Sequence, residues 1–270
     1  MIRDITIGQF FPGESVVHRM DPRMKTLLAL LYMAALFTAA TPAGLAVAAA
    51  FILLVAVLAH IPMRMLLSGI RPLLFVILLA GVVNIFYVPG HALAHVWIFT
   101  ITREGIATAV FMSVRVIFLI IGASMLTYTT SPIMLTDGLD VLLSPLAKLK
   151  LPVHELSMMM TIALRFIPTL TEETDKIMQA QKARGADFES GNLLRRVKAL
   201  LPILIPLFVS AFRRADELAL AMDCRCYQGG QGRTRLHVLR FAPRDYLAAA
   251  SVVLLFAFVL ALNFVLPHVI

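Results

Sequence analysis

Two residue pairs in this sequence have types and spacing that could bind a metal or do redox chemistry. Cys224 and Cys226 lie one residue apart in a basic stretch, and His91 and His95 lie four apart. The cysteine pair lacks the ligand count of a zinc site. The histidines would share a helix face, but they lie in an expected short external loop without a third ligand. We therefore expect free thiols in a reducing compartment, structural or surface histidines, and no bound metal.

Arg115 is a third candidate because it falls near the middle of an apolar run, Ile106–Tyr128. A cation there costs at least about 2.5–3.5 kcal/mol unless it finds a partner. The nearest acid, Glu104, is about 16 Å away at 1.5 Å per residue. We expect carbonyls, another helix or water to hold the guanidinium, in an internal structural role or, alternatively, at a contact with another subunit.

Motifs for enzymatic chemistry are missing from the sequence. The glycines at 229, 230 and 232 are followed by Arg233 rather than by the Lys-Ser/Thr ending of a phosphate-binding loop. There is no metalloprotease or nucleophile-elbow motif, and no pair of carboxylates inside an apolar run. The chain is therefore predicted to be non-catalytic, to hydrolyse no ATP itself and to bind no cofactor.

Composition predicts a membrane protein. Hydrophobic residues make up 60% and charged residues 15% of the 270, and the mean hydropathy is +0.86. The net charge is +8, but the Lys and Arg residues that cause it lie between apolar runs rather than in a patch interleaved with aromatics. This distribution argues against nucleic-acid binding. Five runs approach the roughly 17–25 residues that a membrane-spanning helix needs. They are Thr26–Ala40, Ala43–Ile61, Pro72–Pro89, Ile106–Tyr128 and Tyr246–Pro267.

The basic residues predict the orientation of these spans. Sixteen of the 24 Lys and Arg fall between Lys148 and Arg244, and with five spans all the basic segments lie on one side. The N-terminus is therefore expected in the cytoplasm and the C-terminus outside an inner (cytoplasmic) membrane. No cleaved signal is expected, because the first twenty residues lack an apolar core. We divide the all-α, polytopic chain into a membrane region (1–130), a cytoplasmic coupling-helix region (131–243) and a last span (244–270).

Two helical series in the polar region share one phase, and each ends at an arginine. Each series steps alternately by four and three residues, as a packing seam does, and every member of the second lies 41 residues after its counterpart. The first runs through Leu156, Met160, Ala163, Ile167, Leu170, Thr174, Ile177 and Gln181 to Arg184. The second runs through Val197, Leu201, Leu204, Phe208, Ala211, Ala215, Leu218 and Met222 to Arg225. Glycine follows each arginine closely, which predicts two helices with exposed cationic tips.

The sequence resembles the T components of energy-coupling-factor (ECF) transporters, the EcfT family, which is related to CbiQ. The ordered motifs that carry the resemblance are Pro12-Gly13-Glu14-Ser15, His18, Asp21-Pro22-Arg23 with Lys25, Thr130-Ser131-Pro132, Arg165-Phe166-Ile167-Pro168 and Ala180-Gln181-Lys182-Ala183-Arg184-Gly185. In that family two X-Arg-X motifs dock into grooves on two ABC-type ATPase (EcfA-like) subunits. The resemblance assigns this role to Ala183-Arg184-Gly185 and to Cys224-Arg225-Cys226.

The resemblance implies a coupling subunit that transmits ATPase movement to a separate vitamin- or micronutrient-binding membrane S component, while the ATPases use the ATP. Selectivity would then reside in another chain. The second motif departs from the family's commoner Ala-Arg-Gly, because Cys224 and Cys226 replace both small neighbours of Arg225. The alternative is a self-contained secondary transporter or lipid-handling membrane enzyme, for which Arg115 is the one supporting residue.

Overall fold

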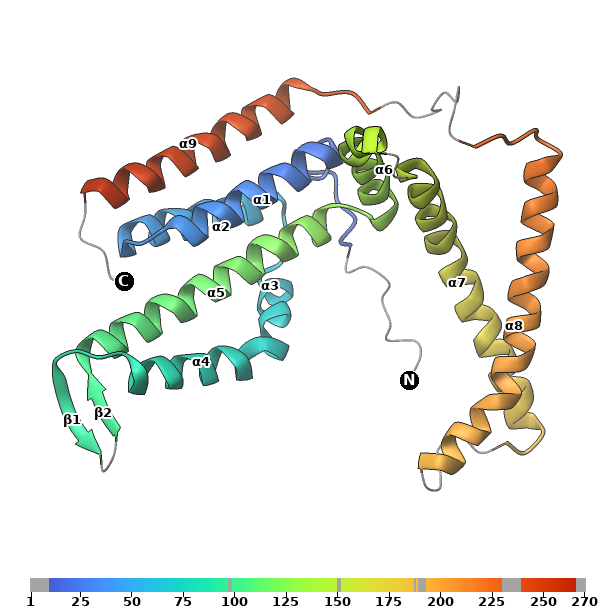
Figure 1. Ribbon diagram of the computed structural model, residues 1–270, viewed down its shortest axis with the longest axis horizontal. Helices are drawn as coiled ribbons and strands as arrows, with labels where there is room; N and C mark the ends of the chain where they lie inside the picture. Colours follow the sequence, from blue (N-terminus) through green and yellow to red (C-terminus); the bar gives the residue numbers. More distant parts are fainter. Residues whose placement is uncertain are drawn as a thin grey trace. The chain divides into compact units, whose positions relative to one another are not determined.

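The computed structural model describes residues 10–96, 99–149, 152–186, 188, 193–229 and 239–265. Helices dominate this part of the chain (Figure 1). The elements are α1 (Pro22–Thr38), α2 (Pro42–Leu58), α3 (Met63–Ile70), η1 (Arg71–Leu73), α4 (Leu74–Tyr87), β1 (Ala92–Val96), β2 (Phe99–Thr102), α5 (Arg103–Thr129), α6 (Pro132–Leu143), η2 (Ser144–Leu149), α7 (Val153–Ala183), α8 (Leu193–Asp223) and α9 (Pro243–Val265). The predicted all-α class is confirmed, with one short strand pair added.

Contacts divide the described chain into two units. The apolar unit comprises residues 10–141 and 239–265, and the crossed-helix unit comprises residues 142–229. Most of α6 lies with the apolar unit, because Gly138 packs against the start of α1, where a Cβ would come 3.2 Å from that of Pro22. The three-part division expected from the sequence remains a prediction.

Each of the five predicted spans coincides with a helix in the described residues. Three helices there are long and apolar enough to cross a membrane, namely Met63–Tyr87, Arg103–Thr129 and Pro243–Val265, and Pro42–Leu58 is a shorter apolar helix. The helical segment that contains the third predicted span begins at Met63, nine residues before the predicted start at Pro72. This proline, which has no N–H to donate, lies in the tight turn η1 that joins α3 to α4, and Figure 1 shows the two helices at an angle to each other.

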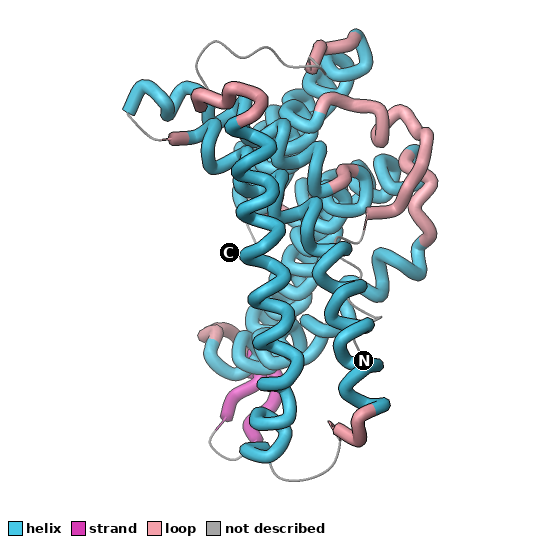
Figure 2. The backbone as a smooth tube through the Cα atoms, turned by 90° about the vertical axis from the view of Figure 1, so that its right-hand side faces the viewer, coloured by secondary structure: helices cyan, strands magenta, loops and turns pink. Residues whose placement is uncertain are grey.

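The core of the apolar unit lies where α1, α2, α5 and α9 pack side by side (Figures 1 and 2). Small residues line the contacts, and Ala35 and Ala48 are fully buried. Gly122 lets α5 approach Tyr32 of α1, because a Cβ there would lie 2.5 Å from the tyrosine ring. Close packing through small residues is typical of helices in membranes.

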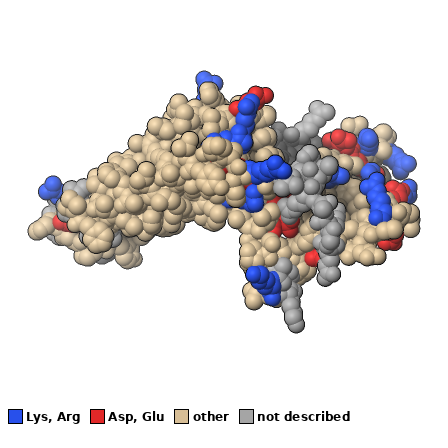
Figure 3. Space-filling model, turned by 90° about the horizontal axis from the view of Figure 1, so that it is seen from above, with Lys and Arg blue, Asp and Glu red and all other residues tan. Residues whose placement is uncertain are grey.

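The surface of the apolar unit matches hydrocarbon rather than water. Large apolar side chains of α4 and α9 are exposed, with Phe75 at 74% and Leu254 at 69%. In Figure 3 most of this unit's visible face carries no Lys, Arg, Asp or Glu. Such an extensive apolar surface would be a liability in water and is what a lipid-facing protein requires.

The segment around His91 and His95, expected as a short loop between two spans, is a β-hairpin that connects α4 to α5. β1 pairs antiparallel with β2, drawn in magenta in Figure 2, and His95 lies within β1. Residues four apart on a strand are about 13 Å apart along the chain, which removes the shared helix face considered from the spacing. Among the described residues there is no cluster of three metal-ligating side chains.

A polar cluster joins the start of α1 to the end of α5 and the start of α9. The Asp245 carboxylate, 1% exposed, accepts hydrogen bonds from the backbone N–H groups of Asp21 (3.0 Å) and Ala242 (2.7 Å). The buried Lys25 ammonium donates to the carbonyls of His18 (3.0 Å) and Thr129 (2.8 Å), the latter at the end of α5. The motif residues of the N-terminal segment therefore hold the apolar unit together.

Arg23 completes this cluster. Its guanidinium donates to both carboxylate oxygens of Asp21, at 3.0 and 2.8 Å, and lies 4.4 Å from the centre of the Phe241 ring. Burial of Asp21 opposes its ionisation, but the hydrogen bonds and charge of Arg23 outweigh that effect and hold the pKa of Asp21 below its ordinary value. Asp21 also caps the N-terminus of α1 by accepting from the Arg23 N–H.

Candidate functional site

Arg184 occupies the C-cap of α7, where the chain closes the helix with a Schellman motif. The N–H of Gly185 donates to the carbonyl of Lys182 at 3.0 Å, and the N–H of Ala186 donates to that of Gln181 at 3.0 Å. Gly185 has φ +85°, the left-handed conformation that this motif needs. Ala183 is the last residue of the helix. The Gly185 position thus fixes the helix end directly after Arg184, as predicted.

Arg225 occupies the equivalent position after α8, and the same motif forms there. The N–H of Cys226 donates to the carbonyl of Asp223 at 2.9 Å, and the N–H of Tyr227 donates to that of Met222 at 3.1 Å. Every atom pair is displaced by 41 residues from its counterpart on α7, since 226 − 185 = 41 and 227 − 186 = 41. Cys226, at φ +55°, replaces glycine in the left-handed position.

The two helices run in opposite directions and cross, and Figure 1 shows the crossing nearer the end of α7 than the end of α8. At the crossing the Glu173 carboxylate of α7 accepts hydrogen bonds from the Ser210 hydroxyl (2.8 Å) and from the Arg214 guanidinium (2.5 Å) of α8. The Ser210 bond, followed by that of Arg214, lowers the pKa of Glu173 below its ordinary value. Glu173 and Arg214 are therefore both charged, and their ion pair joins the two helices.

The two residues of the Glu173–Arg214 ion pair lie equally far in sequence from the arginine that ends their own helix. Glu173 and Arg214 are 41 residues apart, which is the offset between Arg184 and Arg225. Each tip is therefore 11 residues past the ion-pair residue of its own helix (184 − 173 and 225 − 214), or about 16 Å at 1.5 Å per residue.

A second contact ties the helices on the Arg184 side of the crossing. The Gln181 side chain donates to the carbonyl of Pro202 at 3.4 Å. Pro206 lies four residues after Pro202 in α8 and has no N–H, so the helix itself cannot satisfy that carbonyl. The helix-interior proline thus frees an acceptor that α7 uses.

The seam positions are not buried along the whole of either series. Near the crossing Leu170 and Leu218 are partly buried, but Leu201 and Phe208 are 50% and 61% exposed and Leu156 is 49% exposed. Helices that cross make contact over a few turns, so the outer seam positions separate. The expectation that Arg184 and Arg225 are exposed tips is confirmed.

Both tip arginines lack an internal partner. Within the described residues neither guanidinium makes a hydrogen bond or ion pair. Cys224 and Cys226 beside Arg225 are free and exposed. A cation at a helix C-terminus is favoured by the helix dipole, so each arginine is stable where it lies while its donors stay available. The arrangement can therefore bind an anionic group from outside the chain.

Arg115 is held differently, and it lies apart from the tips in the apolar unit. Its guanidinium donates to the carbonyl of Ala39, the C-cap of α1, and lies 4.7 Å from the centre of the Phe111 ring. The side chain of Asn263 on α9 accepts from the Ala40 N–H at 3.1 Å and donates to the Thr38 carbonyl at 2.6 Å. Arg115 and Asn263 thus satisfy the turn between α1 and α2. The expected carbonyl partner is confirmed, and Glu104 instead accepts from the His91 N–H.

Two functional features escaped the sequence reasoning. The Glu173–Arg214 pair had a usable signal, because opposite charges stand at positions related by the same 41-residue offset as the tips. Asp245 had a weaker one, an acid in the first turn of an apolar helix. One of its two partners, Asp21, is 224 residues away in sequence, and no local pattern indicates this contact.

The fold and the paired helix ends define a polytopic α-helical membrane protein with a crossed pair of arginine-tipped helices. A family model described as cobalt transport protein, CbiQ, matches residues 13–237, which is more than half of the chain. The chain therefore belongs to the CbiQ family.

Relatives match over nearly the whole length. A protein of Acidaminococcus fermentans named energy-coupling factor transporter transmembrane protein EcfT is 53% identical over 267 residues, covering 99% of this chain and 100% of the relative. Proteins of the same name from Ruminiclostridium cellulolyticum and Bacillus subtilis are 50% and 45% identical, covering 98% and 95% of this chain and 99% and 97% of the relatives. The predicted family is confirmed.

Proposed function

We propose that this chain is the non-catalytic coupling subunit of an ECF-type importer, in which Arg184 and Arg225 dock two ABC-type ATPase subunits that use the ATP. One observation carries the proposal. Two helices joined by residues at equivalent positions end in the same motif, and each presents a guanidinium that has no hydrogen-bond or ion-pair partner among the described residues. The names of the relatives support it, because they place those proteins in energy-coupling factor transporters.

The crossed helices provide the mechanical part of this proposal. Each has 31 residues and is about 46 Å long at 1.5 Å per residue. Closure of the ATPase pair would move both docked tips, and the joined crossing would pass the displacement along the rigid helices. Exposed apolar residues such as Leu201, Leu204 and Phe208 on α8 fit a contact with the bilayer or with a membrane-embedded S component.

The rival function, a self-contained secondary transporter or lipid-handling enzyme, rested on Arg115 as a binding residue within the membrane. The Arg115 guanidinium donates to the Ala39 carbonyl and lies over Phe111, so its interactions are with the chain's own helix end. We therefore favour coupling over substrate binding in this chain.

The proposal requires both tips to face the cytoplasm, as the Lys and Arg distribution predicts for an inner-membrane protein. A reporter fused after Arg64, or between Lys148 and Arg240, should read as cytoplasmic, and one after His91 should read as external. An external reading beside Arg184 would end the proposal.

Uptake in membrane vesicles supplied with ATP tests the proposal functionally. Arg184→Ala or Arg225→Ala alone should slow uptake, and the double variant should stop it while the protein remains in the membrane. Charge reversal to Glu should be worse than Ala, because it would place like charges together in the dock. Wild-type uptake by the double variant would remove the basis of the proposal.

A further inference from the structure

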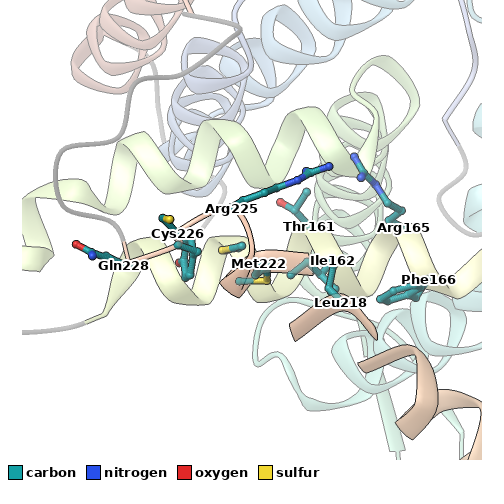
Figure 4. Close-up of a pocket in the computed structure, with 12 residues that line it drawn as sticks. Thr161, Ile162, Arg165, Phe166, Leu218, Met222, Arg225, Cys226 and Gln228 are labelled. Atoms are coloured by element: carbon teal, nitrogen blue, oxygen red, sulfur yellow. The ribbon is translucent and has the colours of Figure 1, made fainter. Parts of the chain in front are cut away.

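A groove of about 630 Å³ opens beside the Arg225 tip, between the first half of α7 and the end of α8. Apolar side chains from both helices form its floor, including Met158, Ile162, Phe166, Leu218 and Met222. The backbone from Cys226 to Gly229 closes one side. Figure 4 shows these groups converging from two helices.

Two guanidinium groups lie at this groove, and they come from different helices. Arg165 of α7 and Arg225 after α8 both line it, and in Figure 4 their side chains extend toward one another. Both residues are exposed, and within the described residues neither makes a hydrogen bond or ion pair. Two like charges beside one groove repel each other, so an anion that meets both would be bound more strongly than by either alone.

The Arg184 tip has no second arginine at the equivalent place. Position 165 + 41 is 206, which is Pro206 in α8. The two tips share their backbone motif, yet among the described side chains a cation pair beside an apolar groove is found at the Arg225 tip. The groove is therefore a feature of the Arg225 tip and not a consequence of the helix-end motif.

We infer that Arg165 is a second docking residue. It joins Arg225 in binding one acidic side chain of the ATPase subunit that docks at this tip. The inference rests on the proposed function and adds a residue and a site to it. The apolar floor favours a protein segment over a free anion, because an acidic residue flanked by an apolar one satisfies the guanidinium pair and fills the floor together. Methionine side chains at 158 and 222 can adapt to such a segment.

The affinity of each purified ATPase subunit for the full-length chain in detergent tests this inference. Arg165→Ala should weaken binding of one subunit about tenfold or more and leave the other within about twofold, and Arg165→Lys should recover part of the loss. In an Arg225→Ala background the Arg165→Ala change should cost less than it does alone, because both arginines share one acid. Arg213→Ala on exposed α8 is the matched control and should stay within about twofold.

The results separate this inference from the proposal beneath it. If Arg225→Ala weakens binding and Arg165→Ala does not, the inferred docking role of Arg165 is wrong and the proposed docking through Arg225 stands. If neither Arg184→Ala nor Arg225→Ala has an effect, the proposed function itself is wrong. If Arg165→Ala leaves ATPase affinity unchanged but reduces binding to vesicles of anionic lipid relative to zwitterionic lipid, the groove binds a lipid headgroup and the inference is overturned.

Discussion

The apolar unit and the crossed-helix unit treat their charged groups in opposite ways. In the apolar unit Arg115 and Lys25 donate to backbone carbonyls and Asp245 accepts from backbone N–H groups, and each of these contacts ties segments distant in sequence. In the crossed-helix unit one ion pair joins the helices, while the arginines at both tips meet no partner in the described chain. Charged side chains that stabilise the fold make their hydrogen bonds within it, whereas charged side chains at rigid helix ends remain available to bind another molecule.

Arg115 sharpens the contrast because it too lies at a helix C-terminus, that of α1, but reaches it from α5. The same electrostatic preference for a cation at a helix end therefore operates in both units. The difference is that the Arg115 guanidinium donates to a carbonyl of the chain, whereas the guanidinium groups at the tips do not within the described residues. This difference predicts which substitutions change stability and which change only association.

The largest effect on stability is expected from Asp245→Ala. The change leaves the N–H groups of Asp21 and Ala242 without an acceptor, and each buried orphan costs about 1–3 kcal/mol. Thermal unfolding in detergent should show a lower Tm, with a smaller loss for Asp245→Asn, which keeps one acceptor oxygen. An unchanged Tm for the alanine variant would show that the polar cluster does not hold the apolar unit.

Arg115→Leu should be next, with a loss of about 1–3 kcal/mol, because the Ala39 carbonyl loses its donor. Membrane insertion should be intact. The paired control is Arg184→Leu, for which the Tm should not change, since that guanidinium meets no partner in the part of the chain that the structure describes. Equal Tm values for the two variants would break the contrast between the units.

Much of this contrast could be predicted from the sequence, because it depends on local signals. Gly185 marked the end of α7, the 41-residue offset placed Arg225 in the same phase, and the depth of Arg115 required a polar partner. The helix crossing could not be read from a 3.5-residue period, since that period indicates a stripe but not the angle at which two stripes meet. The β-hairpin and the Asp245 cluster depend on pairings that periodicity does not specify.

A smaller, opposite effect is expected from Cys226→Gly. Its φ of +55° strains a side chain with a Cβ, and glycine should stabilise the helix end by about 0.5–1 kcal/mol. With Cys224→Ala the variant regains the commoner Ala-Arg-Gly motif, and uptake should be retained. Hydrogen exchange of the last turn of α8 measures the stabilisation. Loss of uptake would instead assign a specific role to the thiols.

The smallest effect concerns the crossing. Glu173→Gln keeps the hydrogen bond from Ser210 but removes the ion pair with Arg214, so uptake should fall by only about twofold while ATPase affinity is unchanged. Uptake rates and subunit affinities measured on one preparation separate coupling from docking. A large loss of affinity would show that the pair positions the tips rather than joining the helices.

The central claim is that Arg184 and Arg225 are docking residues, and its most direct test is the equilibrium affinity of the ATPase subunits for the purified chain. Truncating one side of a buried charge pair costs about 2–5 kcal/mol, and each 1.4 kcal/mol is about tenfold in affinity. Arg184→Ala with Arg225→Ala should therefore weaken binding by more than about thirtyfold at each tip, at an unchanged Tm. Wild-type affinity of a correctly folded double variant would contradict the account.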